Sequence, residues 1–210
     1  MKPLRLLLLA SGRGSHAVNL IEATRDGRID GTVSRLVCDR PDAPVVAAVT
    51  KLGVPVSVLE PVRSGARLAP EAEERLIERI REDRPDLVAL CGFMRLLRAE
   101  TLQRAGVPFL NVHPSLLPEF RGLEAQRQAV EAGATRTGAT VHFVDAGMDT
   151  GPIVMQAPLE IRPGETAEQL AERLLPLEHS LYVEAIRRIQ RESIGKSPRE
   201  SLRESPGENQ

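Results

Sequence analysis

The sequence predicts an α/β fold, an open and mostly parallel sheet of about seven strands with helices on both faces and an antiparallel hairpin at one edge. Short apolar runs alternate along the chain with amphipathic stretches, which is the pattern of parallel strands covered by helices. The 210 residues suffice for one domain with a full core. Only 2% of them are aromatic, so this core must be aliphatic. The expected arrangement is Rossmann-like.

The first half of the chain alternates strands and helices. Its expected strands are short apolar runs at residues 4–9, 33–38, 54–59, 87–90 and 109–112. A helix follows the first strand as far as residue 26, and a shorter helix covers residues 45–52. A third helix begins at Pro70 and ends at Arg84, because Leu76, Ile77 and Ile80 share one face and Pro85 cannot continue the helix.

The second half departs from this alternation. Residues 139–144 and 153–161 are expected strands, and the segment between them is too short for a helical crossover, so we expect them to pair antiparallel at one edge. Thr166 and Gln169 form a capping box for a last helix, which Pro176 should kink or split. Residues 191–210 are rich in Ser, Pro, Gly and charge, and we expect them to be a disordered tail.

Composition excludes several classes of function. The 28 Lys and Arg nearly balance the 29 Asp and Glu, so no broad basic field exists for nucleic acid or anionic membrane. Cys38 and Cys91 lie in apolar strands and suit reduced thiols, while the four histidines are far apart and no metal-ligand spacing occurs. The apolar run near the N-terminus is too short for a signal peptide. We expect a soluble cytoplasmic domain without a metal.

A glycine-rich turn directly follows the first strand and opens a helix. Its residues are Gly12-Arg13-Gly14-Ser15-His16-Ala17. Unpaired backbone N–H groups and the helix dipole make such a turn a site for a phosphate. The turn also matches the dinucleotide pattern G-x-G-x-x-A, and Asp39 ends the next strand, where an acid would bind a ribose. NAD binding is therefore an open alternative.

Two polar side chains share one face of a buried strand. Asn111 and His113 are two residues apart, so both point the same way at the carboxyl end of that strand, where open α/β sheets bind ligands. An amide and an imidazolium can both donate to an oxyanion that forms on a carbonyl. Asp149, on a glycine-flanked loop, either makes a turn or approaches His113 to hold it and move a proton.

Four segments together resemble the phosphoribosylglycinamide formyltransferases, a folate-dependent family of the wider formyltransferase superfamily. They are Cys91-Gly-Phe-Met-Arg-Leu-Leu97, Asn111-Val-His-Pro-Ser-Leu-Leu-Pro118, Thr137-Gly-Ala-Thr-Val-His-Phe-Val144 and Met148-Asp-Thr-Gly-Pro152. The resemblance runs from about residue 4 to residue 189. It implies one formyltransferase domain over residues 1–190, with a phosphate-binding N-terminal half and a folate-binding and catalytic C-terminal half. It also implies a cis peptide bond before Pro118.

The resemblance implies formyl transfer from 10-formyltetrahydrofolate, a co-substrate, to the amine of glycinamide ribonucleotide in purine biosynthesis. Asn111, His113 and Asp149 would be catalytic. The residues that would hold the ribonucleotide are Ser11, Gly12, Arg13, Gly14, Ser15, His16 and Glu178. Those that would flank the folate are Met94, Arg95, Leu96, Leu97, Val144, Asp145 and Gly147. Small molecules would be the only partners, and the protein would be a monomer or a homodimer.

Several residues depart from the family pattern. Arg13 and His16 replace two amides of the phosphate loop, and Glu124 and Gln126 stand where many members carry His, so we expect a secondary contact to be lost there. Alternatives are formyl transfer to another amine, hydrolysis of the formylfolate, and an NAD-binding module. Neither remaining histidine is expected to be catalytic. We expect His142 to be a buried, hydrogen-bonded structural residue and His179 an orienting neighbour of Glu178.

Overall fold

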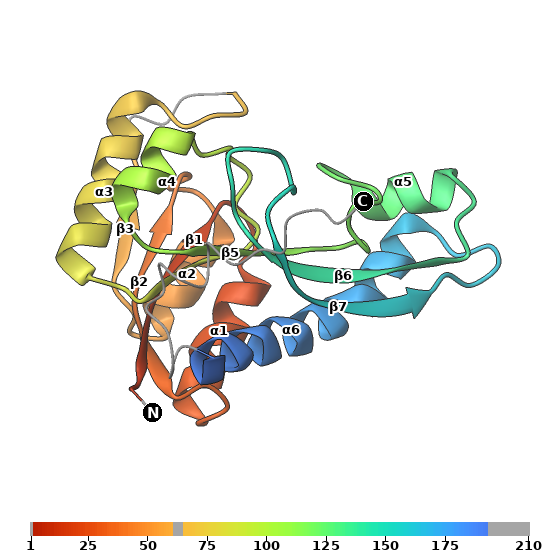
Figure 1. The fold of residues 1–210 in the computed structure, drawn as a ribbon, viewed down its shortest axis with the longest axis horizontal. Helices are drawn as coiled ribbons and strands as arrows, with labels where there is room; N and C mark the ends of the chain where they lie inside the picture. Colours follow the sequence, from red (N-terminus) through yellow and green to blue (C-terminus); the bar gives the residue numbers. More distant parts are fainter. Residues whose placement is uncertain (1, 61–64, 193–210) are drawn as a thin grey trace, which may run out of the picture.

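The computed structural model describes residues 2–60 and 65–192. Within these residues one sheet has seven strands in the order β3-β2-β1-β4-β5-β6-β7 (Figure 1). The strands are β1 (Leu4–Ala10), β2 (Gly31–Cys38), β3 (Val56–Val58), β4 (Leu87–Leu90), β5 (Phe109–His113), β6 (Arg136–Phe143) and β7 (Ile153–Glu160). Pairing is parallel from β3 to β5 and antiparallel from β5 to β7. The predicted fold class and the antiparallel edge pair are confirmed.

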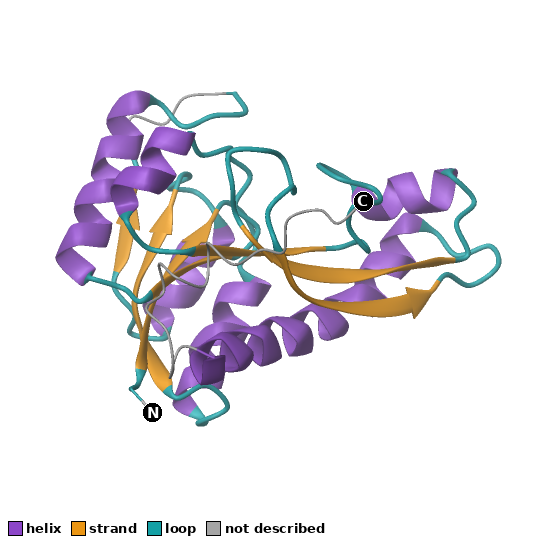
Figure 2. Ribbon diagram, in the orientation of Figure 1, coloured by secondary structure: helices purple, strands orange, loops and turns teal. Residues whose placement is uncertain are grey.

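Helices cover both faces of the sheet (Figure 2). Along β1, Leu6 and Leu8 pack into one core, beneath α1 (Ser15–Arg25), α2 (Pro44–Lys51) and α6 (Ala167–Glu192). Leu7 and Leu9 pack into the other core, beneath α3 (Pro70–Asp83) and α4 (Ala99–Ala105). The side chains of a strand alternate between faces, and all four leucines are fully buried, as the continuous apolar run predicts. The remaining helix, α5 (Ala125–Glu131), contacts β6 and α6.

The chain reverses its direction of winding between β1 and β4, which are neighbours in the sheet. The loops that leave their carboxyl ends diverge there, and this is where open α/β sheets form a ligand crevice. Ser11 joins the two loops: its N–H donates to the Gly92 carbonyl at 3.2 Å, and its hydroxyl accepts from the Met94 N–H at 2.9 Å. The fold thus positions both loops against each other.

Four elements differ from the sequence prediction. Helices α4 and α5 were not expected, and β3 is three residues long rather than six. Pro176 does not split α6, which is continuous over 26 residues. Its capping box is confirmed, because the Thr166 N–H donates to Gln169 Oε1 at 3.0 Å and the Gln169 N–H donates to Thr166 Oγ1 at 3.3 Å. Helix α6 runs through Glu192, and residues 193–210 of the expected tail lie outside the described residues.

Three smaller expectations concern a peptide bond before a proline, the two cysteines and membrane-spanning helices. The peptide bond between Leu117 and Pro118 is cis. Cys38 and Cys91 are buried and form no disulfide. No helix within the described ranges has the length and apolar character that crossing a membrane requires.

Candidate active site

The end of β5 carries the first two polar groups of the site. Asn111 and His113 lie on the same face of this strand, and His113 is buried. His113 Nε2 is 2.9 Å from the carbonyl oxygen of Phe120, so this nitrogen carries a proton and donates it. The hydrogen bond fixes the ring and leaves Nδ1 facing the loop that follows β6.

That loop brings Asp149 to the histidine. Asp149 Oδ2 lies 3.4 Å from His113 Nδ1 and accepts a hydrogen bond of 2.9 Å from the Gly122 N–H. The backbone of Asp149 has a φ of 53°, a left-handed conformation that a non-glycine residue adopts at some cost. Burial alone would raise the pKa of Asp149, but hydrogen bonds from His142 and Gly122, with the charge of His113, hold that pKa below its ordinary value.

His142 is the fourth member of this cluster. In the antiparallel pairing of β5 with β6 it lies directly opposite Asn111, and its Nε2 is 3.3 Å from Asn111 Nδ2 and 3.5 Å from Asp149 Oδ1. Its Nδ1 donates to the Phe143 carbonyl at 2.9 Å. When the His142 ring is neutral, its Nε2 therefore accepts a hydrogen bond from the Asn111 amide. When the ring is charged, Nε2 carries a proton and donates it to Asp149.

The expectation for His142 was incomplete. The ring is buried and hydrogen-bonded as predicted, yet its partners are two of the three predicted catalytic residues. The signal that locates it is the register across β5 and β6, which the sequence did not supply.

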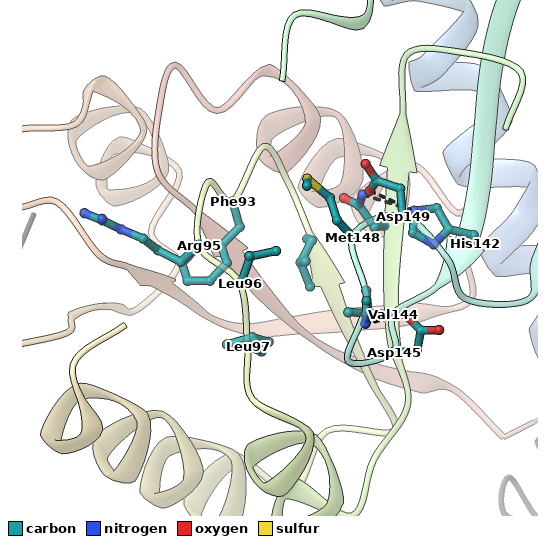
Figure 3. Close-up of a pocket in the computed structure, with 12 residues that line it drawn as sticks. Phe93, Arg95, Leu96, Leu97, His142, Val144, Asp145, Met148 and Asp149 are labelled. Atoms are coloured by element: carbon teal, nitrogen blue, oxygen red, sulfur yellow. Dashed lines mark hydrogen bonds and ion pairs between the residues drawn. The ribbon is translucent and has the colours of Figure 1, made fainter. Parts of the chain in front are cut away.

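A small cavity adjoins these groups, between loops 93–97 and 144–149 (Figure 3). Six of the predicted folate residues line it, namely Arg95, Leu96, Leu97, Val144, Asp145 and Gly147. Asp145 also shapes the loop, because its Oδ1 accepts from the Gly147 N–H at 3.0 Å and from Thr150 Oγ1 at 2.7 Å. Met94, the seventh, lines the neighbouring cleft instead and is 60% exposed.

The side chain of Arg95 extends away from this cavity (Figure 3). Its Nε lies 2.6 Å from Asp39 Oδ2, and its guanidinium also donates to the Gly65 carbonyl. Asp39 is buried and held by this ion pair. The acid that an NAD-binding module would use for a ribose is therefore engaged by the protein itself.

A cleft of about 1280 Å³ adjoins the cavity and shares Asn111 and Asp149 with it. Among its lining residues are Gly12, Arg13, Gly14, Ser15, His16 and Glu178, all predicted to hold the ribonucleotide. Ser11 does not line it, since its N–H and hydroxyl bind the Gly92–Met94 turn. Glu124 and Gln126 line it as well, and Glu124 pairs with Arg127 at 2.9 Å.

Helix α1 begins at this cleft without a side-chain cap. The N–H groups of its first turn have no acceptor within the helix and are available to a ligand. Gly14 precedes the helix with a φ of 84°, and a Cβ at this position would overlap the Val45 side chain. The close approach of α2 thus explains a glycine at this point of the turn.

Glu178 reaches the cleft from the middle of α6, opposite α1. Because the helix is continuous across Pro176, Glu178 keeps its place on the inner face and is buried. Its Oε2 lies 2.9 Å from His16 Nε2. Nowhere in residues 2–60 and 65–192 do three or more His, Cys, Asp or Glu side chains form a group that could hold a metal ion.

Comparisons with known proteins agree in sequence and in structure. The model of the formyl transferase family matches residues 4–186. The phosphoribosylglycinamide formyltransferase of Bacillus subtilis (strain 168) is 37% identical over 185 residues, which cover 88% of this chain and 94% of that protein. A trifunctional purine biosynthetic protein, adenosine-3 of Homo sapiens, is 33% identical over 185 residues, only 18% of its own length.

Solved structures give the same result. The crystal structure of glycinamide ribonucleotide transformylase 1 from Symbiobacterium toebii has a TM-score of 0.81 and 42% identity, covering 88% of this chain and 86% of that one. The structure of phosphoribosylglycinamide formyltransferase from Bacillus halodurans has a TM-score of 0.83 and 35% identity, covering 91% and 97%.

Proposed function

This chain belongs to the formyl transferase family, and we propose that it transfers the formyl group of 10-formyltetrahydrofolate to the amine of glycinamide ribonucleotide, a step of purine biosynthesis. One observation carries the proposal: Asn111 and Asp149 line both the small cavity and the large cleft, and His113, whose Nδ1 lies 3.4 Å from Asp149 Oδ2, also lines the cleft. A donor in the cavity and an acceptor in the cleft would therefore meet at these residues.

The cavity suits the pterin ring of a folate. Its apolar lining residues include Leu90, Leu96, Leu97, Val144 and Phe93, and its polar lining residues include Asn111, His142, Asp145 and Asp149. An apolar slot with a few fixed polar groups is the usual form of a small-molecule site. The loop that Asp145 holds in shape supplies one side of this slot.

The cleft suits a phosphorylated amine. The uncapped start of α1 offers backbone N–H groups to a phosphate, and Arg13 can add a charge-assisted hydrogen bond. Glu178 would accept hydrogen bonds from the glycinamide part of the acceptor, as a buried carboxylate does. Replacing the family's amides by Arg13 and His16 therefore leaves the main-chain phosphate site intact.

The proposed reaction begins when the acceptor amine attacks the formyl carbon and the carbonyl electrons move onto the formyl oxygen. Asn111 Nδ2 has a second N–H besides the one facing His142, and this N–H donates to the oxyanion. His113 contributes positive charge rather than its Nε2–H, which Phe120 already accepts. Asp149, which is held beside the charged His113, takes the proton that the amine loses and delivers it to N10 of the folate as the bond from carbon to N10 breaks.

Two alternative reactions would use the same proposed catalytic residues. A hydrolase would replace the amine by water, and a relative could formylate another amine. The uncapped helix start beside Arg13 favours an acceptor with a phosphate over both of these. The NAD alternative is disfavoured because Asp39 is buried against Arg95. We also propose a cytoplasmic location, since two buried and unpaired cysteines fit a reducing compartment.

A steady-state assay with 10-formyltetrahydrofolate, followed spectrally with and without glycinamide ribonucleotide, tests the proposal. Turnover only with the ribonucleotide is expected. Folate consumption that ignores the ribonucleotide would establish a hydrolase. A melting shift with folate but no turnover would mean that the acceptor is a different amine, and stabilisation by NAD alone would restore the dinucleotide alternative.

A further inference from the structure

His16 places an ionisable ring inside the proposed acceptor site, where the resembled family carries an amide. It belongs to the first turn of α1, lines the cleft and is only 13% exposed. Its Nε2 lies 2.9 Å from Oε2 of Glu178, whose side chain is 8% exposed. Water compensates such a carboxylate poorly, so a charge on His16 is well placed to balance it.

The neighbouring His179 does not share this role. Its ring packs edge-to-face against His16 with the centroids 4.9 Å apart. The Nε2 atoms of both rings are buried without a hydrogen-bond partner in the described part of the chain, and only that of His16 has an ion-pair contact, with Glu178. Burial, with the charge of His16, lowers the pKa of His179. Of the two adjacent imidazoles, His16 is the one that contacts a carboxylate. A positive charge is therefore stabilised on His16 rather than on His179.

The other titratable groups around His16 leave this pairing undisturbed. Tyr182, on α6, has its ring centroid 6.4 Å away, and burial raises its pKa, so it is neutral. Burial likewise raises the pKa of the Cys91 thiol at the base of the cleft. Glu22, on the same helix as His16, acts on His179, and Arg13 is exposed three residues earlier. Helix α2 presents aliphatic side chains here.

We propose that His16 is a positioning residue for the acceptor, whose charged ring holds Glu178 by one oxygen and makes the cleft's affinity for the phosphorylated amine depend on pH. The inference rests on the function proposed above. With His16 charged, Oε2 of Glu178 is engaged and Oε1 is left to the acceptor. With His16 neutral, an uncompensated carboxylate stands beside the helix start at which an anionic phosphate binds, and the two repel.

Proton linkage determines the direction in which the acceptor KM changes with pH. The charged form of His16 binds the acceptor better, so the acceptor KM rises as the pH increases through the titration of His16. By reciprocity, acceptor binding draws a proton onto His16. A contribution of about 1.4 kcal/mol from this ion pair would change the acceptor KM roughly tenfold.

Three proteins test the inference: the wild type, His16→Asn and, as a matched control, His179→Asn. The KM for glycinamide ribonucleotide and for 10-formyltetrahydrofolate is measured for each between pH 6 and 9. Calorimetry of glycinamide ribonucleotide binding, in two buffers of different ionisation enthalpy, counts the protons taken up without any turnover. Because the phosphate itself titrates near a pKa of about 6, the comparison between variants isolates His16.

The wild type and His179→Asn should show the rise in acceptor KM and the proton uptake, and His16→Asn should lose both. The folate KM should stay the same in all three. Parallel pH profiles in the wild type and His16→Asn, or equal proton uptake, would overturn the role of His16. Binding with His16-dependent proton uptake but no formyl transfer would instead refute the proposed function and leave the role of His16 standing.

Discussion

The carboxylate of Asp149 contacts two histidines of the proposed catalytic site, His113 and His142, and replacing it by an amide tests what its charge contributes. Asp149→Asn keeps an oxygen that can accept from the Gly122 N–H, and asparagine tolerates the left-handed φ of 53° at this position. The substitution therefore leaves the loop in place. It removes the negative charge that lies 3.4 Å from His113 Nδ1 and 3.5 Å from His142 Nε2.

The size of the effect follows from these distances. At 3.4 Å and an effective dielectric constant of about 20, a carboxylate and an imidazolium attract by about 5 kcal/mol before desolvation is subtracted. Positioned proton transfer contributes roughly 10²–10⁴ in rate, or about 2.7–5.4 kcal/mol of barrier. Both figures predict that kcat of Asp149→Asn, with both substrates saturating, falls by roughly two to four orders of magnitude.

The matched control is Asp145→Asn, on the same loop. Its carboxylate accepts from Gly147 and Thr150 and touches none of the catalytic side chains. It should lose far less kcat than Asp149→Asn, and both variants should melt within a few degrees of the wild type. A kcat for Asp149→Asn within tenfold of the wild type would refute the charge argument, and so would equal losses in the two variants.

Four further outcomes are expected. Tyr182→Phe should lower the free energy of unfolding by about 1–2 kcal/mol in urea, because the buried hydroxyl donates to main-chain carbonyls of β4 and β5, with kcat of the folded enzyme nearly unchanged. Gly14→Ala should raise the acceptor KM, and adding Val45→Ala should restore part of the loss; an unchanged KM would contradict the close packing there. Asp145→Ala should raise the folate KM and not the acceptor KM, since it frees one wall of the cavity. Since the pKa of Asp149 is depressed in the folded state, its contribution to stability is present at neutral pH and lost below about pH 4, so the urea midpoint of the wild type should fall more steeply there than that of Asp149→Asn.

The sheet was predictable because its central strands are buried on both sides. Continuous apolar runs located β1 and β4 to within one residue at either end, and the short link before β7 predicted its antiparallel pairing. Helices α4 and α5 escaped prediction for the opposite reason. Each is seven residues long, α4 buries only Thr101 and α5 buries only Ala125 and Ala129, so neither has a stripe of large apolar side chains that the sequence would reveal.

Pro176 shows tertiary packing prevailing over a local rule. A proline costs a helix one hydrogen bond and adds a clash, which predicts a kink or a split at Pro176. Helix α6 nevertheless stays continuous, with Leu174 before the proline and Leu181 after it both buried. The packing of these side chains outweighs the local penalty, and it keeps Glu178 on the face that lines the cleft.

Some residues of the site could be placed from their spacing along the sequence, and others only from the pairing of distant strands. Asn111 and His113 share a face because they are two residues apart on one strand, which the sequence alone states. His142 joins them only because β6 pairs with β5 in the register that sets Asn111 opposite it. A slip of one residue would turn every side chain of β6 to the other face and remove His142 from both Asn111 and Asp149. The register of this antiparallel pair therefore determines which side chains meet in the proposed active site.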